Sequence, residues 1–290
     1  MKWDILSKGV RIDMKKVRIE KNTVQETLIV PLYGRKMCSE KFPELYTDSF
    51  AKKLCDNLDY DFSELEKKNN SFLYEFGSLE AAMRQLDMIW EIKEYLKKYP
   101  KAVLVNLGCG LDETGKACDN GLCRIVNVDF PDVIEVRKEL IIEQDREQNI
   151  ACDLKDYSWM DRIDGANGVI FFAAGVFHYF KRDEVKTLVL ELAKRYKGGC
   201  LVFDSVGKLG LKLMMSKTLK NMGISDVEGL FYINNPIREL NWSKKVKVNS
   251  KGYMLGYYDL KSPNIRFSHR FLAMIGDRMM KMAIHRMDFE

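Results

Sequence analysis

The sequence predicts a doubly wound α/β fold with a mostly parallel sheet. Beyond residue 100, short apolar runs alternate with helical stretches, which is the pattern of strand–helix–strand units with right-handed crossovers. A glycine-rich turn follows the first of these runs, where such sheets often bind a ligand. The composition, with 46% hydrophobic and 31% charged residues over 290 positions, excludes a disordered or collagen-like chain.

The first hundred residues are expected to be mostly helical. Thr47 and Asp48 precede an amphipathic stretch, so a capped helix is predicted there. A second helix is predicted over residues 79–99, because apolar residues recur there at helical spacing and Pro100 cannot continue the helix.

After Pro100, buried strands and helices are expected to alternate and to be followed by a tail. The five strands are predicted at residues 102–107, 124–129, 149–152, 168–173 and 199–204. Helices are predicted at residues 131–140 and 182–196, a long helical insertion at about 208–240, and two further strands at 245–249 and 282–286.

Charge and hydropathy argue against nucleic-acid and membrane partners. The 47 Lys and Arg residues against 42 Asp and Glu leave a net charge of +5, which is spread along the chain. A nucleic-acid partner would need a basic stripe on one face. No uncharged apolar window is long enough to span a membrane, and the N-terminus has no apolar signal segment. A cytoplasmic protein is therefore expected.

Cysteine and histidine usage argues against metal sites and disulfides. The seven cysteines include no C-x-x-C pair. None of His178, His269 and His285 lies at ligand spacing from a cysteine or another histidine. We therefore expect no bound metal, and reduced thiols.

Two features after the first two strands predict a nucleoside site. Gly108, Cys109 and Gly110 follow the first strand, and glycines let the backbone turn sharply and approach a ligand closely. Asp129 ends the second strand, nineteen residues after Gly110, where a carboxylate can accept both hydroxyls of a ribose. The alternatives are an ordinary turn for the glycines and an N-cap of the next helix for Asp129.

The residue at the third position of the glycine motif favours a nucleoside without phosphates. A dinucleotide fingerprint requires a third glycine, and Glu113 stands there instead. A bulky acid beside a pyrophosphate is unfavourable for steric and electrostatic reasons. S-adenosylmethionine fits this interpretation, and a nicotinamide oxidoreductase does not.

The third and fourth strands also end in candidate site residues. Asp153 can accept the adenine amino group while Leu154 covers the ring, although both can instead cap the following helix. The fourth strand ends in the small residues Ala173 and Ala174, which leave room for a substrate. His178 and Tyr179 follow shortly after as polar contacts or, alternatively, as packing residues, and they are the candidate catalytic residues.

Several motifs in order resemble the leucine carboxyl methyltransferase family, in its bacterial branch of polyketide-synthesis (tetracenomycin-type) O-methyltransferases. They are QETLIVPLYGRK, LDYDFSEL, VNLGCGLD, NVDFPDVIEVRKELI, ACDLKDYSW, AAGVFHYF and LVFDSVGKLG. The resemblance covers about residues 24–210. It implies a Rossmann-like class I S-adenosylmethionine-dependent methyltransferase, whose seven-stranded sheet has an antiparallel last strand. It further implies a helical cap over residues 1–100 and a cofactor-binding domain over 101–290.

The resemblance also implies a cofactor site and a product, S-adenosylhomocysteine. Arg84 matches an arginine that pairs with the methionine carboxylate, and Arg35 matches a second basic residue nearby. A guanidinium fork suits a carboxylate. The full set of expected cofactor-binding residues is Arg35, Arg84, Gly108, Cys109, Gly110, Asp129, Asp153, Leu154, Ala173 and Ala174.

Two departures from the family pattern bear on activity. The family commonly reads G-L-D-T-R, whereas Gly110 is followed here by L-D-E-T and the arginine is missing. The family commonly has an acid at the position of Ala174. Losing one charge-assisted hydrogen bond to the cofactor's ammonium group costs about 1.5–3 kcal/mol, roughly ten- to a hundred-fold in affinity.

The leading hypothesis is an O-methyltransferase that acts on a carboxyl or hydroxyl group of a small molecule. A carboxylate acceptor is ionised at neutral pH and needs no base, whereas a hydroxyl acceptor would use His178. One alternative is methylation of a protein C-terminal carboxylate. Another, suggested by Ala174, is a cofactor-binding but catalytically weak module that acts through a partner.

Overall fold

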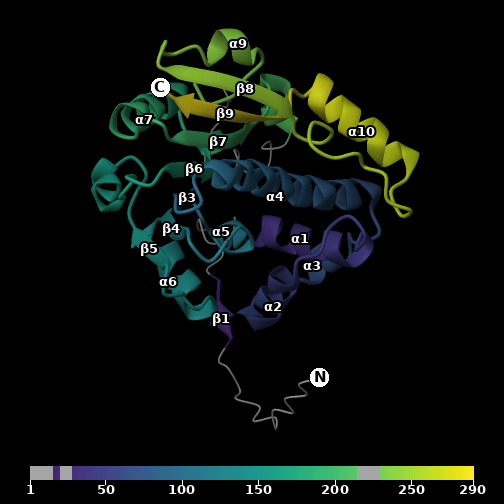
Figure 1. Ribbon diagram of the computed structural model, residues 1–290. Coiled ribbons are helices and arrows are strands. Elements are labelled where there is room, and N and C mark those ends of the chain that lie inside the picture. The colour runs from purple at the N-terminus through teal and green to yellow at the C-terminus, as the bar shows by residue number, and fades with distance from the viewer. Residues whose placement is uncertain (1–15, 20–27, 214–228) are drawn as a thin grey trace, which may run out of the picture.

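The computed structural model describes residues 16–19, 28–213 and 229–290, and a seven-stranded sheet forms its centre (Figure 1). The strand order is β5-β4-β3-β6-β7-β9-β8. The strands are β3 (Val103–Leu107), β4 (Arg124–Asp129), β5 (Glu147–Ala151), β6 (Val169–Ala173), β7 (Cys200–Ser205), β8 (Val246–Gly252) and β9 (Ala283–Phe289).

The sheet has the predicted topology. Strands β3 to β7 pair in parallel, and the chain order reverses between β3 and β6, which makes this the topological switch point. The last strand, β9, lies antiparallel between β7 and β8. The predicted bounds of β4 agree with the structure, whereas β5 begins two residues earlier than expected, at Glu147.

Helices cover both faces of the sheet (Figure 1). They are α1 (Ile29–Lys41), α2 (Ser49–Asn57), α3 (Ser63–Glu66), α4 (Phe72–Lys98), α5 (Thr114–Ala117), α6 (Pro131–Leu140), α7 (Arg182–Arg195), α9 (Pro236–Glu239) and α10 (Phe267–Arg278). The predicted cap of α2 is confirmed, because Asp48 accepts a hydrogen bond from the Ala51 N–H at 2.8 Å. A two-residue parallel pair, β1 (Val17–Arg18) with β2 (Leu58–Asp59), lies apart from the main sheet.

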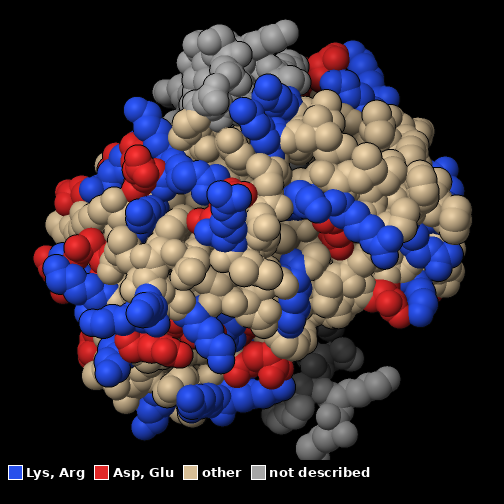
Figure 2. All heavy atoms as spheres, turned by 90° about the horizontal axis from the view of Figure 1, so that it is seen from above, with Lys and Arg blue, Asp and Glu red and all other residues tan. Residues whose placement is uncertain are grey.

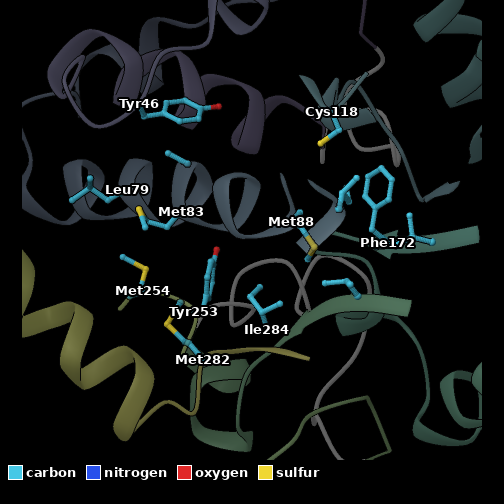
Figure 3. Packing of buried hydrophobic residues seen from close by; sticks show 14 of the residues in the cluster. Tyr46, Leu79, Met83, Met88, Cys118, Phe172, Tyr253, Met254, Met282 and Ile284 are labelled. Carbon is cyan, nitrogen blue, oxygen red and sulfur yellow. The ribbon is translucent and has the colours of Figure 1, made fainter. Parts of the chain in front are cut away.

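Two hydrophobic clusters sandwich the sheet. One cluster fills the space between the sheet and α4, and Figure 3 shows Met83 of α4 near Tyr253 and Met254, with Phe172 and Ile284 on the strands. The other cluster packs α7 against the opposite face. A third, smaller cluster joins α1 and α2 to α6 and to Leu111 in the loop after β3. Helices α1 and α2 therefore pack directly against that loop.

The expected helical insertion is only partly present. Residues 208–213 are helical, residues 214–228 lie outside the described residues, and the segment from 229 to α9 is not helical, so the prediction is wrong there. The cause is tertiary pairing: the Phe231 N–H donates to the Phe180 carbonyl at 2.8 Å, and the Ile233 N–H donates to the Val206 carbonyl at 2.9 Å. Both side chains are buried, so an extended segment fills the core there.

The surface and the thiols are consistent with the composition. Figure 2 shows basic side chains interspersed with acidic and uncharged ones over the face in view. All seven cysteines are free thiols. None of the helices in the described part of the chain contains an apolar stretch of membrane-spanning length, and no group of His, Cys, Asp or Glu there is arranged to hold a metal ion.

Candidate cofactor site

The glycine turn lies at the carboxyl end of β3, next to the switch point. Gly108 and Gly110 have φ angles of +65° and +48°, which favour glycine. A Cβ added to Gly108 would stand 2.7 Å from Cγ2 of Val176 in the loop after β6, so the two loops are in contact. A Cβ on Gly110 would stand 2.8 Å from a methyl of Leu28 at the start of α1.

Asp129 is bound to this turn at the end of β4. Its carboxylate accepts hydrogen bonds from the Gly110 N–H at 2.7 Å and from the Phe130 N–H at 2.8 Å. Burial raises the pKa of Asp129, and these two N–H groups partly offset the rise. The alternative role as N-cap of α6 is wrong, because Phe130 occupies that position and α6 has no side-chain cap.

Glu113 does not present an uncompensated charge to the site, which corrects part of the argument against a dinucleotide. Its carboxylate pairs with Arg137 at 2.8 Å and with Lys116 at 3.1 Å. Arg137, which is 1% exposed, also donates to the carbonyls of Gly110 at 3.0 Å and Asp112 at 2.8 Å. The electrostatic conflict expected from Glu113 is therefore absent, because this buried network neutralises its charge.

An ion pair between α4 and β7 lies at the carboxyl ends of β6 and β7. Arg84 Nη1 lies 3.5 Å from Asp204 Oδ2, and His178 Nε2 lies 3.3 Å from the same oxygen. The other oxygen of Asp204 accepts from the Gly175 N–H at 2.6 Å. Burial acts to raise the pKa of Asp204, but Arg84, His178 and this N–H outweigh it and hold that pKa well below its usual range.

The loop after β6 places the predicted small and polar residues as follows. Ala173 is buried in the strand, and Ala174 is partly buried. His178 is buried in a short 3₁₀ helix, and its Nδ1 has no hydrogen-bond partner among the described residues. Tyr179 is 42% exposed. Partial burial raises the pKa of its hydroxyl, Arg84 lowers it and Asp204 raises it.

Arg35 and Cys109 have contacts within the protein. Arg35 donates to Asp48 at 3.0 Å and to the Leu111 carbonyl at 3.3 Å, and it lies 3.6 Å from Asp112. It therefore ties α1 and the cap of α2 to the glycine loop, and its contact with a cofactor stays a prediction. Cys109 is buried, which raises the pKa of its thiol well above its usual range and disfavours the reactive thiolate.

Asp153 and Leu154 form the turn after β5. The Asp153 carboxylate accepts from the Lys155 N–H at 2.9 Å, and Leu154 packs into the hydrophobic cluster under α7. A hollow of about 330 Å³ opens beside Leu154, between this turn and the first turns of α7. The Cys152 N–H donates to the Asp129 carbonyl at 2.8 Å, which links this turn to the end of β4.

Sequence reasoning missed Asp204, Arg137 and Glu80. Asp204 is the last residue of the predicted strand 199–204, as Asp129 is of the strand 124–129, so the rule that selected Asp129 would also have selected Asp204. Glu80 lies one helical turn before Arg84 on α4, and burial raises its pKa to about 7 while Arg84 lowers it. No local signal identifies either Arg137 or Glu80.

Comparison with known proteins identifies the family of the chain. A family model of leucine carboxyl methyltransferase matches residues 30–193. The tetracenomycin polyketide synthesis O-methyltransferase TcmP of Streptomyces glaucescens is 27% identical over 184 residues, which are 63% of this chain and 66% of that protein. The chain thus matches slightly less than two thirds of the length of TcmP.

Two solved structures share the fold. A Thermobifida fusca protein with a provisional methyltransferase assignment superposes with a TM-score of 0.60 at 15% identity, covering 96% of this chain and 97% of that one. The plantazolicin methyltransferase BpumL, in complex with SAH, superposes with a TM-score of 0.50 at 12% identity, covering 92% and 99%. Because the family model matches more than half of this chain, the chain belongs to the leucine carboxyl methyltransferase family.

Proposed function

We propose that the protein is a cytoplasmic S-adenosylmethionine-dependent O-methyltransferase that acts on a carboxyl or hydroxyl group of a small, polyketide-like molecule. The observation behind it is that the glycine turn, Asp129 and the Arg84–Asp204 pair gather at the carboxyl ends of neighbouring strands, at the switch point. Membership of the family, the name of TcmP and the SAH bound by BpumL support the same reaction.

The residues present fit S-adenosylmethionine. Two glycines with positive φ let the backbone approach a ligand, and Asp129 offers a carboxylate beside them for ribose hydroxyls. Asp153 and Leu154 would serve the adenine. Arg84 supplies a cation for the carboxylate at the amino-acid end of the cofactor.

The structure of the cofactor determines what the protein itself has to do in the reaction. When bound, S-adenosylmethionine would supply an electrophilic methyl group for transfer to the acceptor oxygen, with S-adenosylhomocysteine as the leaving group. The protein then has to position the acceptor oxygen and exclude water. A carboxylate acceptor needs no base. For a hydroxyl acceptor, His178 is the nearest base, with Nε2 held by Asp204 and Nδ1 without a partner among the described residues.

Isothermal titration with S-adenosylmethionine and S-adenosylhomocysteine tests the proposal. We expect binding by the wild-type protein and a loss of about ten- to a hundred-fold in the Arg84→Ala variant, because a charge-assisted pair is removed. Arg146→Ala is the matched control. Arg146 directly precedes the edge strand β5 and pairs with Asp119, away from the carboxyl ends of β6 and β7 where Arg84 lies. An absence of binding to the wild type at millimolar ligand would refute the assignment.

A methyl-transfer assay then separates the acceptor classes. Radioactive methyl transfer is measured to an aromatic polyketide acid, to its methyl ester with free phenols, and to a peptide with a free C-terminal carboxylate. Transfer to the acid alone indicates carboxyl methylation. Transfer to the ester indicates hydroxyl methylation, and transfer to the peptide would replace the small-molecule proposal.

A further inference from the structure

Asp204 stands beside Ala174, on the neighbouring strand. Ala173 pairs with Phe203 in the register of β6 and β7, so Ala174 and Asp204 follow at the same level of the sheet. Ala174 packs against the cluster under α4, and Asp204 contacts Arg84 of α4, so both side chains lie on the face that α4 covers. The site thus contains a buried carboxylate one strand away from Ala174.

The carboxylate of Asp204 is held in place and can still accept further hydrogen bonds. Oδ1 is fixed by the Gly175 N–H at 2.6 Å. Oδ2 has two long contacts, with His178 Nε2 at 3.3 Å and Arg84 Nη1 at 3.5 Å. A carboxylate has about four acceptor positions, and charge-assisted hydrogen bonds are usually shorter than 3 Å. One acceptor position, on Oδ1, therefore has no donor among the described residues, and the two contacts of Oδ2 are long enough for a closer cationic donor to replace them.

We propose that Asp204 binds the ammonium group of the cofactor while Arg84 binds its carboxylate; this inference rests on the proposed function. The amino-acid end of S-adenosylmethionine has an ammonium and a carboxylate on one carbon atom. The Arg84 guanidinium and the Asp204 carboxylate, 3.5 Å apart, form the opposite charge pair. The site therefore keeps an acid for the ammonium group although Ala174 lacks one, which removes the main support for a catalytically weak module.

Three ligands separate the parts of the cofactor in titrations of the unmodified protein. S-adenosylhomocysteine has both charges, its deaminated analogue S-adenosyl-4-thiobutyrate keeps only the carboxylate, and 5′-methylthioadenosine lacks the amino-acid end. We expect the wild type to bind S-adenosylhomocysteine about ten- to a hundred-fold more tightly than the deaminated analogue. Equal affinity for these two ligands would overturn the inference without any variant.

The Asp204→Asn variant tests the residue itself, with Asp288→Asn as the control because Asp288 pairs with Arg286 at the other end of the sheet. We expect Asp204→Asn to lower the affinity for S-adenosylhomocysteine to that of the deaminated analogue and to leave 5′-methylthioadenosine unaffected. The double variant Ala174→Asp with Asp204→Asn moves the carboxylate to the neighbouring strand. It should again bind S-adenosylhomocysteine more tightly than the deaminated analogue.

The outcomes also separate this inference from the proposed function. An Asp204→Asn variant that binds all three ligands like the wild type, or that loses all three equally, contradicts the role in ammonium binding. Wild-type protein that binds none of the three ligands contradicts the proposed function itself.

Discussion

Gly175 stands directly against the guanidinium of Arg84: a Cβ added to Gly175 would lie 2.6 Å from Nη1 and 3.1 Å from Cζ. The backbone of Gly175 has φ +72°, and its N–H holds Asp204. One residue without a side chain thus lets an arginine and a carboxylate from two different elements meet beside the loop after β6.

Gly175→Ala should therefore displace Arg84 from Asp204. We expect about a tenfold loss of affinity for S-adenosylhomocysteine with little change for 5′-methylthioadenosine, measured by titration. The control is Gly198→Ala, whose φ is +82° with no atom within 4 Å of the added Cβ, so it has the backbone strain alone. Equal effects of the two variants on binding would contradict the contact argument.

Asp129→Asn tests the other end of the cofactor. Because Asp129 faces the glycine turn and is proposed to bind ribose, we expect the affinities for S-adenosylhomocysteine and 5′-methylthioadenosine to fall together, by about tenfold. Asp132→Asn, an exposed carboxylate in the first turn of α6, is the control. A loss confined to S-adenosylhomocysteine would assign Asp129 to the amino-acid end instead.

Local sequence patterns were sufficient to predict the strands and to place several candidate site residues at the strand ends. Strands β3, β6 and β7 are buried throughout and β4 in all but its first residue, whereas β5 also contains an exposed alanine. Because the carboxyl ends of parallel strands lie at one edge of the sheet, Gly108, Asp129 and Asp153 could be assigned to that edge from the sequence. Helix α10 could not, because its buried face consists of only His269, Ala273 and Gly276, while two of its phenylalanines are exposed. Its apolar residues therefore do not mark its buried side.

The role of Arg137 could not be predicted either, because its partners are distant in the sequence and it looks like an ordinary helical surface residue. Glu113 lies 24 positions away and Glu147 lies 10 positions away. The carbonyls of Gly110 and Asp112 also accept from Arg137. Only the folded chain brings these groups together under the glycine turn.

Arg137→Met should accordingly destabilise the protein strongly. It leaves two buried carboxylates with Lys116 as their remaining cationic partner, and two backbone carbonyls lose their donor. Removing one partner of a buried ion pair costs up to about 3–5 kcal/mol of unfolding free energy, and Lys116 places the expected loss at the lower end of that range. Arg146→Met breaks the Arg146–Asp119 pair, in which the arginine side chain is 42% exposed, and should cost less than about 1 kcal/mol. Urea unfolding measures both, and similar losses would contradict the structural role of Arg137.

Asp87 of α4 should make stability depend on pH. It is fully buried, and neither carboxylate oxygen has a hydrogen-bond partner among the described residues. Burial raises its pKa to about 9, with the charges of Asp277 and Glu91 adding to the rise and Lys251 opposing it. The folded protein therefore keeps a proton on Asp87 that the unfolded chain releases near pH 4.

The sign follows from this difference in bound protons. The contribution of Asp87 to stability is largest at low pH and falls as pH rises towards 9, by up to about 1.4 kcal/mol per pH unit. Between pH 7 and 8.5 the change exceeds that from Glu80, whose pKa is about 7. Asp87→Asn keeps the shape without the titration, so its thermal midpoint should fall less over this range than that of the wild type. An unchanged pH slope in this variant would show that Asp87 does not hold a proton in the folded state.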